Sequence, residues 1–123
     1  MTVQELYASI GGDYGEAIGR LRAERLISRF VVKFCDDASC GELIDAWERG
    51  DEGAAFKAAH TAKGVCANLS LTELAGLASQ ITEALRPGNE SLRAQTDVDA
   101  LVAQFGSSYE NAVTQIRRFA DEQ

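Results

Sequence analysis

The chain has 123 residues, of which 46% are hydrophobic and 25% charged, values that suit one globular domain with a single core. Its net charge of −7 at pH 7 argues against nucleic acid and anionic membranes as partners, because both attract a basic face. The N-terminus lacks the pattern of a secretion signal, and no apolar run approaches the roughly 20 residues that span a bilayer, so we expect a cytoplasmic protein.

Residues 1–21 carry signals for two short helices. Thr2 followed by Glu5 is a capping box, which predicts a first helix that ends near residue 9. A Gly-Gly turn follows, and Asp13 can cap a second helix over residues 14–21. We expect this segment to form an N-terminal cap on the rest of the fold.

Apolar residues at spacings of three and four predict an amphipathic helix from Ala23 onward. The polar stretch 36–41 interrupts this pattern, which resumes at Leu43 and ends at Gly50. One bent helix and two separate helices both fit, although Gly41 beside an Asp/Ser cluster favours a break.

Residues 51–69 are predicted to form a helix that begins at Asp51, and two further helices follow it. Ser70 with Glu73 predicts a capping box for the next helix, which Pro87-Gly88 ends. We expect residues 89–95 to be a polar loop, and Thr96 or Asp97 to open a long last helix. The aromatic residues that we expect in the core are Phe30, Phe34, Trp47, Phe105 and Phe119.

Short connections between long amphipathic helices predict antiparallel neighbours. We therefore expect an all-α fold, an up-down-up-down four-helix bundle over residues 22–121, with 1–21 as its cap and 1–123 as a single domain. The odd number of cysteines, the lack of C-x-x-C spacing and the single histidine argue against a structural zinc site. We expect Cys35, Cys40 and Cys66 to be reduced and structural.

The only histidine, His60, lies in the predicted helix 51–69. On a helix that advances about 100° per residue, an apolar stripe lies within about 40° of the pole opposite His60. This stripe consists of Ala58, Ala62, Val65 and Leu69. Because a helix buries such a stripe, the imidazole is predicted to point into solvent.

Lys63 and Gly64 share the predicted face of His60, since they lie three and four residues further on. A glycine inside a helix costs about 1 kcal/mol relative to alanine, and here the missing Cβ clears a path for another protein. Ala67, which also has a small side chain, leaves the same path open. Neutral imidazole is a competent nucleophile near pH 7 and can accept a phosphoryl group, whose charge Lys63 would offset. The pattern indicates docking combined with phosphoryl transfer.

Other interpretations of His60 are weaker. No nucleophile elbow or glycine-rich phosphate loop is present, and a metal bundle would need a glutamate where Lys57 stands. A docking module without phosphotransfer stays open, as does an incidental surface histidine. Phe56 either lines the docking surface or packs on a neighbouring helix, and Lys57 is solvated or meets an acidic partner. Gln80 and Thr82 could reach the phosphoryl group through water, depending on the orientation of their helix.

The segment His60-Thr61-Ala62-Lys63-Gly64, followed by Val65-Cys66-Ala67-Asn68-Leu69, resembles the H-x-x-K-G signature of histidine phosphotransfer (Hpt) domains of bacterial two-component phosphorelays. Gly50-Asp51, Phe56-Lys57-Ala58-Ala59, Leu71 and Leu74 also fit, and the resemblance covers residues 23–85. Ser70 departs from the family, which often has glycine there, and this departure concerns loop geometry.

The resemblance implies a four-helix bundle in which His60 is the phosphoacceptor, Lys63 the charge partner and Gly64 the clearance residue, with Phe56, Lys57 and Ala67 as docking candidates. The partners would be a sensor histidine kinase and response-regulator receiver domains, whose aspartate gives or takes the phosphoryl group. The receiver would supply Mg²⁺, and this chain would hold no cofactor, ATP site or kinase activity of its own. We expect a free-standing monomer that is phosphorylated on Nε2, the outer nitrogen.

Overall fold

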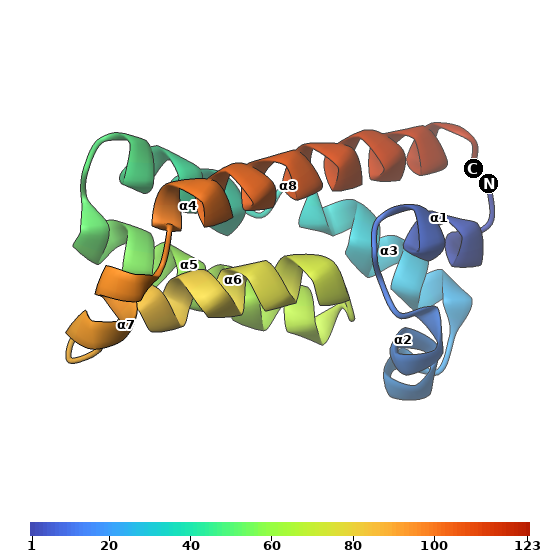
Figure 1. Cartoon of the computed structure of the whole chain (residues 1–123). Helices are drawn as coiled ribbons and strands as arrows, with labels where there is room; N and C mark the ends of the chain where they lie inside the picture. The colour runs from blue at the N-terminus through green and yellow to red at the C-terminus, as the bar shows by residue number, and fades with distance from the viewer.

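The computed structural model describes residues 1–123 and is all-helical, with no strand (Figure 1). None of its helices is both long enough and apolar enough to cross a membrane. The eight helices are α1 (Val3–Ser9), α2 (Tyr14–Leu21), α3 (Glu24–Phe34), α4 (Ser39–Glu48), α5 (Glu52–Asn68), α6 (Thr72–Leu85), α7 (Glu90–Gln95) and α8 (Val98–Asp121).

Four helices begin where the sequence predicts a side-chain cap. Thr2 and Glu5 form the reciprocal capping box at α1. Asp13, Asp51 and Asp97 each accept a hydrogen bond from the backbone N–H three residues later, at the starts of α2, α5 and α8. Each cap satisfies a backbone donor that the first turn of a helix leaves free, so these starts depend on local sequence alone.

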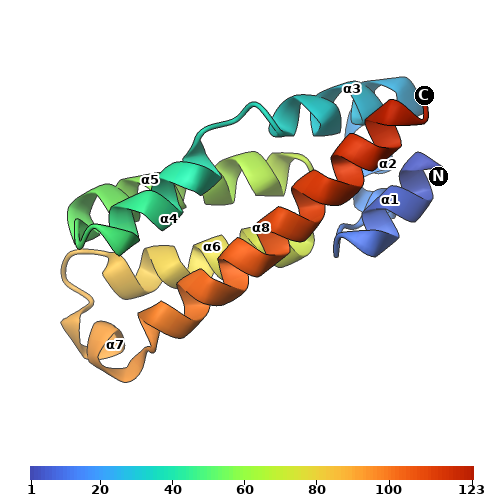
Figure 2. The same ribbon diagram turned by 90° about the horizontal axis from the view of Figure 1, so that it is seen from above.

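The core forms between α4, α5, α6 and α8, where α4 contacts α5, α5 contacts α6, and α8 contacts both α6 and α4. Seen from above, α8 crosses obliquely over α6 (Figure 2). The helices α1 and α3 also pack on α8, which brings the two termini together (Figure 1). There the Met1 ammonium lies 2.8 Å from Glu122. Phe34, Phe105 and Phe119 are buried as expected.

The chain breaks after α3, so residues 24–48 form two separate helices and not one bent helix. The Asp37 carboxylate accepts the backbone N–H of Ser39 at 2.9 Å, which holds the chain in a turn before α4. Gly41, whose position favours a break in the sequence, instead lies inside α4. The interruption therefore lies at the Asp/Ser cluster and not at Gly41.

Two predictions about local structure are wrong. Residues 89–95 are not only a loop, because α7 occupies Glu90–Gln95. Ser70 does not cap α6: it has a φ of +56°, and its hydroxyl donates to Glu16 at 2.9 Å instead. A positive φ explains why glycine suits this position, since L-residues rarely adopt the left-handed conformation.

Two predictions about the core also need correction. Phe30 is 39% exposed, because the core-facing side of α3 is formed by Ile27, Val31 and Phe34. Trp47 is only partly buried, since its indole N–H donates to Asp99 at the rim of the core. The three cysteines are free thiols, and Cys40 and Cys66 are fully buried.

Candidate functional site

Helix α5 presents His60 on its solvent-facing side, as its hydrophobic pattern predicts. The helix packs between α4 and α6, and its buried positions are nearly all alanine. Such small side chains let the backbones of α4 and α6 approach α5 closely on its buried side. The opposite side of α5, which carries His60, stays at the surface. The buried residues of α5 are Ala55, Ala58, Ala59, Ala62 and Cys66.

The imidazole of His60 makes no hydrogen bond or ion pair within the protein. Its ring instead stacks on Phe56, with 6.2 Å between ring centroids and an interplanar angle of 14°. The guanidinium of Arg86, at the end of α6, covers the same phenyl ring at 5.4 Å from its centroid. Phe56 is half-buried, so it packs against α6 and also forms part of the surface beside His60. Both imidazole nitrogens are thus free for chemistry with a partner.

The charge near His60 comes from three side chains. Lys63, one turn further along α5, is half-buried and makes no ion pair. Across from it, Arg86 holds Glu83 through two hydrogen bonds of 2.9 and 3.2 Å. The hydrogen bond from Arg86 chiefly lowers the pKa of Glu83, and the nearby charges of Lys63 and His60 add to this effect. The Glu83 carboxylate is therefore ionised and within electrostatic range of the imidazole.

The structure explains why the sequence did not reveal Glu83 and Arg86. An E-x-x-R pair is a common surface pattern on helices, and it has no functional meaning until the rotation of α6 about its axis is known. The same rotation removes one earlier candidate: Thr82 is fully buried and donates its hydroxyl to the Ala78 carbonyl at 2.7 Å. Gln80 is exposed.

At Gly64 and Ala67, no large side chain projects from the surface next to His60. Both residues are exposed, and a Cβ built on Gly64 would meet no atom within 4 Å. No contact inside the protein therefore requires glycine at this position, although glycine costs about 1 kcal/mol in a helix. Lys57 is exposed on the flank of the same face. His60 and the five residues expected around it, Phe56, Lys57, Lys63, Gly64 and Ala67, thus all lie on α5.

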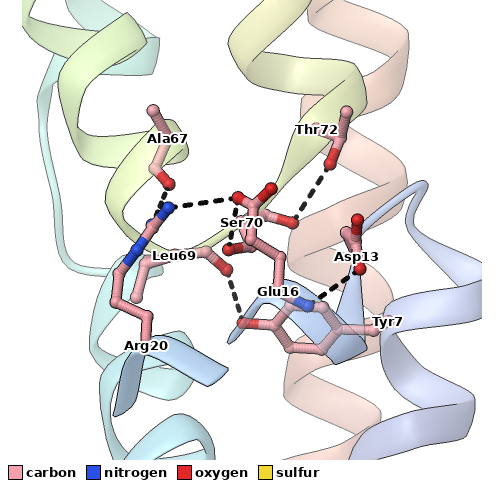
Figure 3. A network of polar contacts seen from close by, with 8 residues as sticks. All are labelled: Tyr7, Asp13, Glu16, Arg20, Ala67, Leu69, Ser70 and Thr72. Atoms are coloured by element: carbon pink, nitrogen blue, oxygen red, sulfur yellow. Dashed lines mark hydrogen bonds and ion pairs between the residues drawn. The ribbon is translucent and has the colours of Figure 1, made fainter. Parts of the chain in front are cut away.

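The turn between α5 and α6 is tied to the N-terminal cap, which fixes the end of the histidine helix (Figure 3). The buried Tyr7 donates its hydroxyl to the Leu69 carbonyl at 2.7 Å, and burial raises the pKa of Tyr7 to about 12. Ser70 is anchored through its hydroxyl to Glu16. Further hydrogen bonds run from the Asp13 N–H to the Ser70 carbonyl, from the Glu73 N–H to the Gly11 carbonyl, and from the Arg20 guanidinium to the Ala67 carbonyl.

Residues 30–119 match the family model described as Hpt domain. The matched region is most of the chain, and it contains α4 to α7 entirely and α8 as far as residue 119. The chain belongs to the histidine phosphotransfer (Hpt) family. Comparisons with curated proteins and with solved structures gave no match.

Membership of the Hpt family assigns the domain a role in two-component phosphorelays, where Hpt domains work with kinases and receiver domains. The matched region includes His60, the only histidine of the chain. It begins within α3, so α1, α2 and the first turns of α3 lie outside the family pattern. These N-terminal elements of the Hpt protein buttress the α5–α6 turn, as the hydrogen bonds from Tyr7 and Arg20 show.

Proposed function

We propose that His60 is the phosphoacceptor of this Hpt domain, taking a phosphoryl group from, or giving it to, an aspartate of a receiver domain. The lone pair of one imidazole nitrogen attacks the phosphorus of the aspartyl phosphate. The N–P bond forms as the P–O bond to the carboxylate breaks, and aspartate leaves with the electron pair. We propose Nε2 as the attacking atom, because it is the outer nitrogen of an exposed ring.

The single observation that supports this most is the environment of the imidazole. It is exposed, it has no hydrogen-bond partner, and it lies beside the open space at Gly64. A histidine that served the fold would be buried or hydrogen-bonded. Lys63 lies one turn from His60 and makes no ion pair, and we propose that it offsets the charge of the phosphoryl group. Solvent screening limits that contribution to about 1 kcal/mol.

The partner would complete the site. We propose that the receiver domain brings Mg²⁺ and that a sensor histidine kinase is the ultimate phosphate source, since this chain contributes one nucleophile and no nucleotide loop. Phe56, Lys57 and Ala67 would contact the docked receiver, because they surround His60 on the same surface. We further propose that the protein acts in the cytoplasm as a monomeric single domain, with the α3–α4 arm, α5, α6 and α8 as the antiparallel four-helix bundle.

A docking module that binds receivers without phosphotransfer is the alternative function. Such a module would need a complementary surface but no free nucleophile at its centre. The unengaged His60 beside a costly Gly64 therefore favours phosphotransfer.

Phosphotransfer is tested by incubating the wild-type protein and His60→Gln with a panel of radiolabelled phosphorylated receiver domains and Mg²⁺. We expect acid-labile label on the wild-type protein alone. Label on both proteins would show that a residue other than His60 accepts the phosphoryl group. Binding of a receiver without label on either protein would support the docking module instead.

A further inference from the structure

A group of cations on α3 and at its start lacks any partner within the protein. Arg22, Arg25, Arg29 and Lys33 are all exposed, and none makes an ion pair or a side-chain hydrogen bond. The only acidic residue among residues 20–35, Glu24, accepts a hydrogen bond from Tyr14. The arginines that do form ion pairs are Arg20, Arg49, Arg86, Arg93 and Arg118.

Three of these cations form a continuous stripe. Arg25, Arg29 and Lys33 are spaced four residues apart, so they follow one side of α3. The opposite side of α3 faces the core. Like charges at this spacing repel each other, and the chain as a whole carries a net charge of −7. A concentrated positive stripe on an acidic protein is complementary to an acidic partner.

An apolar hollow adjoins the cationic stripe. It has a volume of about 380 Å³ and is lined by Phe30, Lys33 and Phe34 of α3, by Val65 and Asn68 of α5, and by Leu21, Asp37 and Leu69. Phe30 is one of two large hydrophobic side chains exposed on the molecule. Val65 lies on the side of α5 away from His60, whereas Asn68, about two turns beyond the imidazole, is exposed, so the hollow opens beside the C-terminal end of the histidine helix.

We propose that the stripe Arg25–Arg29–Lys33 and the hollow beside Phe30 form a second docking surface, which selects phosphotransfer partners that carry an acidic segment with an apolar side chain. The inference rests on the proposed function, because it assigns this surface to the same receiver that meets His60. Arg25 and Arg29 precede residue 30, where the family match begins, so they are a feature of this chain beyond the family pattern.

A protein segment fits this surface better than a polyanion. Nucleic acid or a lipid headgroup layer would pair with the arginines but would leave the apolar hollow unfilled, and the acidic remainder of the chain would repel an extended anionic surface. An acidic segment with one apolar anchor satisfies both features. Such an anchor in a pocket, with charges at its rim, is the usual arrangement of a protein interface.

The experiment compares two variants with the same change in net charge. The triple variant Arg25→Gln, Arg29→Gln, Lys33→Gln removes the stripe. The control Gln4→Glu, Gln104→Glu, Thr114→Glu alters exposed positions on α1 and α8, whose side chains make no hydrogen bond. Both are titrated with a panel of unphosphorylated receiver domains with Mg²⁺. Labelling of His60 by phosphoramidate, a small donor that needs no docking, is measured in parallel.

We expect the stripe variant to bind its receiver roughly tenfold or more weakly, with a flatter salt dependence, while the control binds like the wild type. Phe30→Ala should also weaken binding but keep the wild-type salt dependence. Equal binding by the stripe variant and the control would overturn the inference. The inference would also be overturned if no receiver of the panel bound, or if poly(U) RNA or anionic vesicles bound the stripe more tightly than any receiver did. A wild-type dimer that the stripe variant no longer forms would overturn it as well. Failure of phosphoramidate to label His60 would instead overturn the proposed function.

Discussion

Replacing Gly64 with alanine should stabilise the protein. Gly64 lies inside α5, and a Cβ there would meet no atom within 4 Å, so the variant gains helix propensity without a clash. That gain is about 1 kcal/mol. For a chain of 123 residues, an unfolding entropy of about 2.1 cal/mol/K per residue converts it into a rise in Tm of about 4 °C. The measurement is a thermal melt followed by circular dichroism.

Gly106→Ala is the matched control for this stability change. Gly106 also lies inside a helix, α8, and its added Cβ would contact only the Ile44 side chain at 3.8 Å, an ordinary distance. Both variants should therefore melt at a higher temperature than the wild type. A fall in Tm for Gly64→Ala alone would show that the fold itself requires glycine, which would refute the clearance argument.

The functional half of the same prediction uses a larger side chain. Gly64→Leu should keep the helix, because leucine is a good helix former, yet it should reduce transfer from a phosphorylated receiver by roughly tenfold or more. Labelling by phosphoramidate should fall much less, since this small donor does not have to dock on the surface around His60. Ala103→Leu, an exposed substitution on α8, is the control for an added surface leucine. Wild-type transfer by Gly64→Leu would contradict the proposed docking geometry.

Two further variants test the charge partner and the buttress of α5. Lys63→Ala should fold normally and slow phosphorylation by up to about fivefold, as expected for a screened interaction of about 1 kcal/mol, and wild-type transfer kinetics would show that the lysine has no role. Tyr7→Phe should lower the stability by about 1 kcal/mol in denaturant melts, because it removes the hydrogen bond to Leu69, and an unchanged midpoint would exclude that contribution. In the wild type, Tyr7 has its pKa raised to about 12, above the value of about 10 expected in the unfolded chain. The stability from neutral Tyr7 is therefore complete below about pH 10 and is lost as the pH rises toward 12, so melts at increasing alkaline pH should show a smaller decline for Tyr7→Phe.

The parts of this fold that sequence predicts well are those decided within a few residues. The caps at Thr2, Asp13, Asp51 and Asp97 depend only on a side chain and the backbone three positions later. The outward direction of His60 follows from one turn of apolar periodicity on either side of it.

The features that sequence could not predict depend on contacts between distant segments. Ser70 looks like a helix cap, but the left-handed conformation of this turn is held by the N-terminal cap, more than fifty residues away. Phe30 fits an apolar pattern, yet its side of α3 meets an open hollow instead of another helix. The Glu83–Arg86 pair acquires meaning only because α6 is rotated to place it beside Phe56.

The role of His60 can be measured directly by NMR of protein labelled with ¹⁵N-histidine. The chain has one histidine, so the spectrum reports a single imidazole. After treatment with phosphoramidate, we expect the Nε2 resonance to shift to that of a phosphorylated nitrogen, and to return when a cognate receiver with Mg²⁺ is added. An imidazole spectrum that stays unchanged while the protein gains phosphate would contradict the account.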